Sequence, residues 1–280
     1  MAKIQQKRTK PIDKAWYILK PFFVYTIAKT FVQLTVSMLI SAVPLKSVAV
    51  WIANNSLLLN AVINGIAALI GVFFVLSDFL KEVTLTGEIN IDQGVIKQFF
   101  SWAKQSVKQN KDKAIELAGV ISLGVTSALG LNIVIELLAI SSEKYQDVEA
   151  IQYSVPLWLG LILYGIIAPI TEEIVFRGIT YNRMKRYFGV VPCIVMTAML
   201  FGGFHANLPQ FLYGTCMGVL MALSYEWVKS FAAPVLFHVA ANCIVFMLSF
   251  VKVDIVHWLI GAFFLGLAGG LIVFLFYRKK

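Results

Sequence analysis

The sequence predicts an all-α, polytopic membrane protein, a bundle of about eight transmembrane helices. Of its 280 residues, 59% are hydrophobic and only 14% are charged, with a mean hydropathy of +0.79. A soluble domain of this size has no need of so much apolar surface. Eight apolar segments are long enough, or nearly so, to cross about 30 Å of hydrocarbon. They are residues 21–43, 56–80, 114–140, 155–176, 190–206, 208–228, 231–251 and 256–276.

The basic residues fall in alternate connections between these segments. Residues 1–20 are basic, the loop at 81–113 holds six lysines, and the loop at 141–154 holds three acidic residues and one lysine. Basic loops remain in the cytoplasm, so we expect a multi-pass cell-membrane protein with both termini cytoplasmic. The net charge of +9 then favours contact with anionic lipids rather than a nucleic-acid partner.

The loop at 92–113 has a helical pattern of its own. Apolar residues at Ile96, Phe99, Phe100, Ala103 and Val107 recur at helical spacing, with lysines mainly on the other positions. This pattern predicts an amphipathic helix on the cytoplasmic leaflet, and a solvated surface helix is an equally good interpretation.

The first apolar segment is interrupted by Lys29, whose side chain we expect to extend to the nearer headgroups. The cysteines, Cys193, Cys216 and Cys243, lie in apolar runs without CxxC spacing, which favours buried small side chains over a disulfide or metal site.

The stretch Thr171–Gly178, TEEIVFRG, places charges deep in the fourth apolar segment. Each charge costs roughly 2.5–3.5 kcal/mol at the centre of a bilayer, so such residues mark candidate functional sites. Glu173 and Arg177 are four residues apart and can pair on one helix face. Glu172 is rotated by about 100° from Glu173, which leaves its carboxylate available for chemistry.

Two further polar pairs repeat the spacing of four residues. Phe201 and His205 lie near the end of the fifth segment, and His238 and Asn242 lie in the seventh. Each pair shares one helix face, and we expect the two histidines to approach Glu172 from neighbouring helices.

Glu172 and His205 lie about 16 residues on either side of the turn between the fourth and fifth segments. In an antiparallel pair they would meet at one depth. This requires the fourth helix to extend about two turns beyond the bilayer, and it leaves residues 206–210 in a polar cavity or broken helix.

This set of residues suits hydrolysis of an amide. A carboxylate beside a histidine can activate a water as general base, while a second histidine and an amide can donate hydrogen bonds to a developing oxyanion. Alternatively, Glu172, His205 and His238 could hold a zinc ion with an open fourth position. Sequence leaves both open, and no serine or cysteine has the partners of a covalent nucleophile.

Other functions fit parts of the pattern. Isolated polar residues in membrane helices often join helices to one another. A scaffold or immunity protein could retain them for packing, and a proton-coupled transporter could use them as a relay. A transporter, however, is expected to have matched features in both halves of the chain, whereas these residues lie in one half.

The three motifs, Glu172-Glu173-x-x-x-Arg177, Phe201-x-x-x-His205 and His238-x-x-x-Asn242, resemble those of the CPBP family. This family, also called Abi, comprises CAAX proteases and bacteriocin-processing enzymes. The resemblance covers roughly residues 155–250, and short loops favour a prokaryotic member. It divides the chain into a basic terminus (1–20), amino-terminal helices with a cytoplasmic loop (21–150) and a catalytic core (151–280).

The resemblance implies an intramembrane endopeptidase whose site opens towards the cytoplasm and whose substrate is a membrane protein or peptide. Glu172 would activate the water with His205 as its partner, and His238 and Asn242 would stabilise the oxyanion. Glu173, Arg177 and Phe201 would support them. Prokaryotic relatives are associated with bacteriocin immunity and peptide maturation, which makes a prenylated substrate a poorer expectation.

Overall fold

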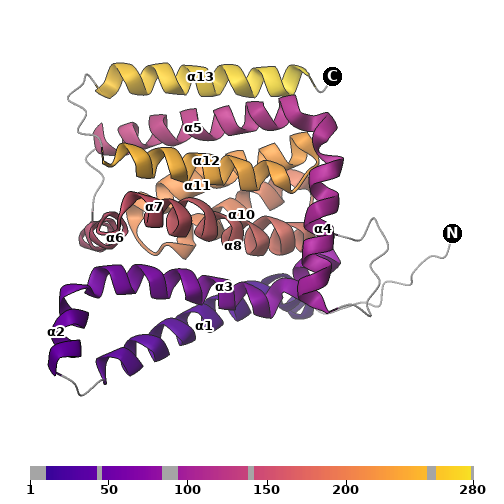
Figure 1. Ribbon diagram of the computed structural model, residues 1–280. Helices are drawn as coiled ribbons and strands as arrows, with labels where there is room; N and C mark the ends of the chain where they lie inside the picture. Colours follow the sequence, from indigo (N-terminus) through magenta and orange to yellow (C-terminus); the bar gives the residue numbers. More distant parts are fainter. Residues whose placement is uncertain (1–10, 43–45, 84–93, 138–141, 251–256, 279–280) are drawn as a thin grey trace.

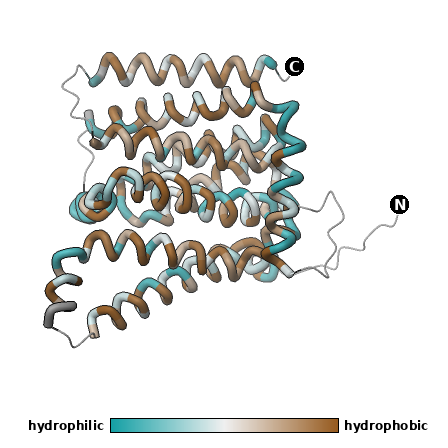
Figure 2. Tube along the Cα trace, in the orientation of Figure 1, coloured by the Kyte–Doolittle hydropathy of each residue, from teal (hydrophilic) through white to brown (hydrophobic). Residues whose placement is uncertain are grey.

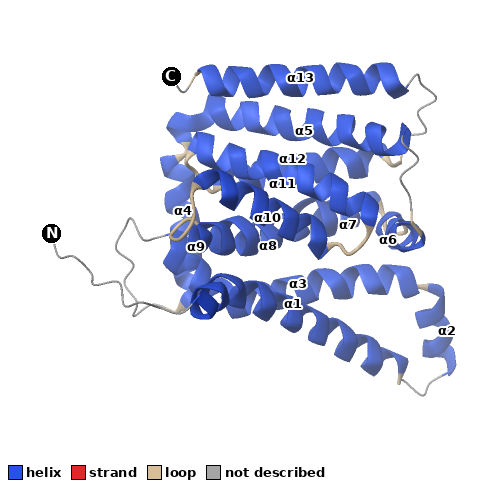
Figure 3. Ribbon diagram, turned by 180° about the vertical axis from the view of Figure 1, so that it is seen from behind, coloured by secondary structure: helices blue, strands red, loops and turns tan. Residues whose placement is uncertain are grey.

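The computed structural model describes residues 11–42, 46–83, 94–137, 142–250 and 257–278, and within them the chain is helical without a strand (Figures 1 and 3). The expected all-α bundle is therefore confirmed. The helices are α1 (Pro11–Ser41), α2 (Lys46–Asn54), α3 (Ser56–Val83), α4 (Val95–Gln109), η1 (Lys111–Lys113), α5 (Ala114–Leu137), α6 (Glu143–Tyr153), α7 (Leu157–Gly160), η2 (Leu161–Ile167), α8 (Ala168–Glu173), η3 (Ile174–Tyr181), α9 (Asn182–Met184), α10 (Val190–Phe204), α11 (Leu208–Val228), α12 (Ala232–Leu248) and α13 (His257–Tyr277).

The long helices stack side by side. α13 lies at one edge against α5, α5 packs on α12, and α1 and α3 form the opposite edge (Figure 1). The continuous helix from α7 to α9 runs through the middle and contacts α3 on one side and α12 on the other. The segment that carries the charged motif is thus surrounded by other helices.

Within the part of the chain that the structure describes, five helical spans are long and apolar enough to cross a membrane: Pro11–Ser41, Ser56–Val83, Lys111–Glu136, Leu157–Met184 and Leu259–Tyr277. The apolar helices α10 and α12 are shorter. Together with α11, these helices correspond in order to the eight predicted segments.

Three helix boundaries differ from the segments that were predicted from the sequence. α1 begins at Pro11, so half of the predicted basic terminus is helical. The fourth helix continues to Met184, as the depth argument required. The loop at 141–154, expected to be plain connection, forms α6 with Ser142 as its N-cap, because the hydroxyl of Ser142 accepts from the amide of Tyr145.

The predicted amphipathic helix is present as α4, which crosses one end of the bundle (Figure 1). Figure 2 shows hydrophilic residues concentrated along it. Phe99 and Trp102 pack against Phe79 of the core, with ring centroids 6.4 and 5.0 Å away. Phe100 and Val107 stay exposed. One part of the apolar face therefore anchors α4 to the protein and leaves the rest exposed.

The middle helix is locally π-helical on both sides of α8, over η2 and η3. Pro169 lies at the start of α8 and cannot donate a backbone hydrogen bond. Such π segments re-aim side chains and are frequent at functional sites. Here they bracket Glu172 and Glu173.

Candidate active site

The ion pair predicted within the motif is present and completely buried. Nη1 of Arg177 lies 2.7 Å from Oε1 of Glu173, and both side chains are fully shielded from solvent. Nη2 of Arg177 donates to the carbonyl oxygen of Gly218 at 3.0 Å, and the guanidinium lies 4.8 Å from the ring centroid of Phe201. Arg177 therefore joins the middle helix to both α10 and α11.

The approach of α11 to Arg177 depends on small residues. A Cβ at Gly218 would lie 2.9 Å from Cα of Ala198 and 3.3 Å from Nη2 of Arg177. A Cβ at Gly202 would lie 2.5 Å from the carbonyl oxygen of Phe211. The two glycines let α10 and α11 pack backbone against backbone, which is how small residues act in membrane helix interfaces.

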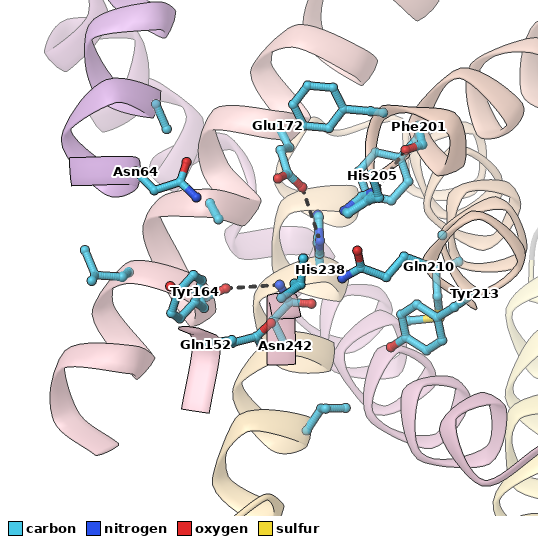
Figure 4. A pocket seen from close by; sticks show the side chains of 18 of the residues that line it. Asn64, Gln152, Tyr164, Glu172, Phe201, His205, Gln210, Tyr213, His238 and Asn242 are labelled. Carbon is cyan, nitrogen blue, oxygen red and sulfur yellow. Dashed lines mark hydrogen bonds and ion pairs between the residues drawn. The ribbon is translucent and has the colours of Figure 1, made fainter. Parts of the chain in front are cut away.

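His238, from α12, lies between the two adjacent glutamates. Its Nδ1 is 3.0 Å from Oε1 of Glu173, and its Nε2 is 3.8 Å from Oε2 of Glu172 (Figure 4). The first contact is a hydrogen bond, whereas the second is too long for one. Because a carboxylate only accepts, Nδ1 carries a proton, and Nε2 faces Glu172 in the cavity.

His205 follows the last residue of α10. Its Nδ1 donates to the carbonyl oxygen of Phe201 at 3.0 Å, and the ring of Phe201 packs edge-on against both His205 and His238, at centroid distances of 5.2 and 5.4 Å. Phe201 therefore separates and orients the two imidazoles. The i,i+4 spacing of Phe201 and His205 thus corresponds to a direct contact between the two residues.

The chain breaks between α10 and α11 at the expected place. Ala206 has φ of 54°, in the left-handed region, and Asn207 caps α11 by accepting from the amide of Gln210. This sharp connection lets Gln210 reach the site cavity. The helix is thus broken at Ala206 and Asn207, while Pro209 and Gln210 line the cavity, so both expectations for residues 206–210 hold in part.

Glu172 and His205 line the same cavity, but no hydrogen bond joins them among the described contacts. Figure 4 shows Glu172, His205 and His238 turned towards one another from three different helices. Glu172 is 8% exposed and His238 is 6% exposed. The nearer imidazole to Glu172 is that of His238, whereas the resemblance implied His205 as its partner.

Asn242 lies one turn beyond His238. Its side-chain nitrogen donates to the carbonyl oxygen of Tyr164 at 3.0 Å (Figure 4). Tyr164 belongs to the π-helical η2, where a backbone carbonyl is free to accept from a side chain. One amide proton of Asn242 thus fixes α12 to the middle helix, and the second is available for a ligand.

The cavity has a volume of 340 Å³. Besides the motif residues, the cavity is lined by polar side chains that were not predicted as site residues from the sequence: Lys29, Asn64, Asn132, Tyr145, Glu149, Gln152, Tyr164, Gln210 and Tyr213. Lys29 does not extend to the headgroups as expected, because its Nζ lies 5.4 Å above the ring of Phe204. In the sequence, these lining residues could be recognised only as polar side chains that interrupt apolar runs.

Two tyrosines of α6 retain their protons at the wall of the cavity. Burial raises the pKa of Tyr153 to about 12, and burial together with a hydrogen bond to Glu149 raises the pKa of Tyr145 above its usual range. Both hydroxyls are therefore neutral donors at physiological pH.

The zinc alternative does not fit this arrangement. Among the described residues, no three His, Cys, Asp or Glu side chains form a group that could hold a metal ion. We therefore derive no step through a metal.

Comparison with known proteins agrees with the motif assignment. Residues 154–244 match the family described as type II CAAX prenyl endopeptidase Rce1-like. The chain is 31% identical over 104 residues to the "Putative membrane peptidase YdiL" of Bacillus subtilis (strain 168). That match covers 37% of this chain and 42% of the relative, so the chain spans less than half the length of that protein.

No solved structure matches the chain significantly. The matched residues begin just before the middle helix and end just after Asn242, so they contain all three motifs. The resemblance seen in the sequence is thereby confirmed: residues 154–244 are similar to the Rce1-like peptidases.

Proposed function

We propose that this chain is an intramembrane endopeptidase that hydrolyses a peptide bond of a membrane protein or membrane-associated peptide with a water activated by Glu172. The observation that carries the proposal is the arrangement around His238. One glutamate of the adjacent pair is neutralised by Arg177, while the other faces two imidazoles across a cavity. A packing motif has no need of a second carboxylate that faces a cavity at that depth.

Glu172 is the general base of this mechanism. A water that donates to Oε2 of Glu172 and approaches Nε2 of His205 would have its lone pair free for the carbonyl carbon. As the oxygen–carbon bond forms, one proton passes to Glu172 and the carbonyl π electrons move onto the oxygen.

His238 and Asn242 supply the donors for that oxygen. With both ring nitrogens protonated, His238 donates from Nδ1 to Glu173 and from Nε2 to the substrate oxygen. Nε2 of His238 lies 3.8 Å from Oε2 of Glu172. A water bound to Glu172 would therefore lie next to a substrate carbonyl oxygen that accepts from His238. The free amide proton of Asn242 adds a second donor.

The reaction is completed by cleavage of the carbon–nitrogen bond. Glu172 returns the proton that it took from water to the leaving amine, and the carbonyl re-forms as a carboxylic acid, so the site ends in its starting protonation state. Glu173, Arg177 and Phe201 do not touch the reacting atoms in this scheme. They hold His238 and His205 in place, as groups beside catalytic ligands commonly do.

The substrate class is part of the proposal. The matching family is described as a prenyl endopeptidase and the Bacillus relative as a membrane peptidase. Both names support peptide-bond hydrolysis next to a membrane. The cavity of 340 Å³ lies at the small end of ligand sites, which suits a short extended stretch of peptide.

Membrane peptidomics tests this function without a known substrate. Cells expressing the wild type are compared with cells expressing Glu172→Gln or His205→Ala, with Glu143→Gln on the exposed face of α6 as the matched control. We expect the same uncleaved proteins to accumulate in both site variants and not in the control. Identical peptide profiles in all four strains would overturn the assignment.

A further inference from the structure

The cavity extends from Glu172 towards one end of the bundle only. Its wall includes Tyr145, Glu149 and Gln152 of α6 and Gln210 at the α10–α11 connection. α6 lies at the end of the bundle opposite to α4 (Figure 1). The polar lining therefore continues from the glutamate to the end that carries α6.

The opposite direction is closed by packing. Every residue of η3, Ile174–Tyr181, is buried, directly after Glu173. Beyond it, Nε of Arg183 lies 2.9 Å from Oε1 of Glu82, and Nη1 of Arg183 donates to the carbonyl oxygen of Tyr17 at 2.8 Å. These contacts hold α1, α3 and α9 together, and no residue of η3 or α9 is among those that line the described cavity.

The closed end is also the basic end. Lys113 donates from Nζ to the carbonyl oxygens of Val228 and Lys229, which places the start of α5 beside the end of α11. The helix α4, which carries lysines, and α9, which carries Arg183, lie at this same end (Figure 3). At the α6 end, the described charged side chains are mainly acidic: Glu136, Glu143, Asp147 and Glu149, with Lys144.

The polar lining of the cavity leads to one end of the bundle, and basic residues gather at the other end. From these two observations we propose that the site opens to the non-cytoplasmic side of the membrane. Basic ends stay in the cytoplasm, so the closed, lysine-rich end faces inward and the polar mouth beside α6 faces outward. This reverses the cytoplasmic opening that the family resemblance implied. It follows from where this chain carries its charges.

Combined with the proposed function, an outward mouth defines the substrate class. The scissile bond lies in an exported peptide or in the outward-facing juxtamembrane segment of a membrane protein. Amide and tyrosine side chains at the mouth can hydrogen-bond to an extended peptide backbone before it reaches Glu172. A substrate presented on the cytoplasmic leaflet, such as a prenylated carboxyl terminus, would meet the closed end.

Cysteine accessibility tests the direction of opening without an activity assay. Cys193, Cys216 and Cys243 are replaced by alanine, and single cysteines are introduced at Gln152 in the mouth, Asn64 deeper in the cavity and Lys104 on α4. Intact cells are treated with a membrane-impermeant maleimide and, for Asn64→Cys, with a small charged methanethiosulfonate. Permeabilised cells provide the reference labelling. Gln210→Cys replaces Asn64→Cys if that variant does not accumulate.

We expect Gln152→Cys and Asn64→Cys to react in intact cells and Lys104→Cys to react only after permeabilisation. The reverse pattern would overturn the orientation, and a failure of the deep cysteine to react from outside would overturn the path. Labelling does not require catalysis, so repeating it in the Glu172→Gln background separates this inference from the peptidase assignment. An inactive protein with outward labelling refutes only the proposed function.

Discussion

The carboxylate of Glu173 lies 3.0 Å from Nδ1 of His238, a hydrogen bond between residues 65 positions apart in the chain. The same oxygen is 2.7 Å from Nη1 of Arg177. The second glutamate of the motif thus couples the buried arginine to the histidine that faces Glu172. Its role is to set the proton and the ring orientation of His238.

Replacing Glu173 by glutamine tests that role. The amide keeps the shape but offers Nδ1 of His238 a neutral acceptor in place of a charged one, which weakens the hydrogen bond that orients the ring. We therefore expect kcat to fall by roughly 10²–10⁴-fold with KM little changed. Cleavage by purified, reconstituted protein measures both constants. An unchanged kcat in folded Glu173→Gln would contradict the assigned role.

Arg177 tests the energetic importance of the buried pair. Arg177→Met leaves the carboxylate of Glu173 buried without its cation, which is expected to lower the free energy of unfolding by about 3–5 kcal/mol. The matched control is Lys229→Gln, which breaks an ion pair with Glu226 whose lysine is 63% exposed and which should cost at most about 1 kcal/mol. Denaturant titration in detergent compares the two. Equal losses would show that the buried pair is not special.

Adjacent glycines of α10 offer a second matched comparison. A Cβ at Gly202 would collide with the backbone of α11, whereas a Cβ at Gly203 meets nothing within 4 Å. We expect Gly202→Ala to destabilise the protein by about 1–3 kcal/mol and to impair cleavage by moving His205. Gly203→Ala should be neutral or stabilising by up to about 1 kcal/mol. The contrast disappears if α10 and α11 do not pack as described.

The described side chains also predict the response to chelators. Because Glu172, His205 and His238 do not form a metal-binding group, we expect cleavage to persist after dialysis against a strong chelator. Elemental analysis of the same sample should find no stoichiometric zinc. Activity that is lost on chelation and restored by zinc would contradict this geometry.

The sequence allowed the helices to be predicted because membrane spans are defined by long apolar runs, and α3, α5, α10 and α11 begin where those runs begin. Local spacing was equally informative within one helix. The pair Glu173–Arg177 and the contact between Phe201 and His205 both follow from i,i+4 geometry.

Contacts between helices could not be predicted in the same way. The choice of His238 rather than His205 as the nearer imidazole to Glu172 depends on how α12 rotates against the middle helix. The position of Lys29 beside Phe204 depends on the path of α1, and a lone lysine within an apolar run gives no sign of it. The opening of the cavity required the three-dimensional position of α6.

The most direct test of the account is cleavage of an identified substrate by purified protein in liposomes, comparing the wild type with Glu172→Gln. The account predicts that the variant folds, melts like the wild type and forms product at least about 10²-fold more slowly. Product formation at the wild-type rate by folded Glu172→Gln would show that another group activates the water.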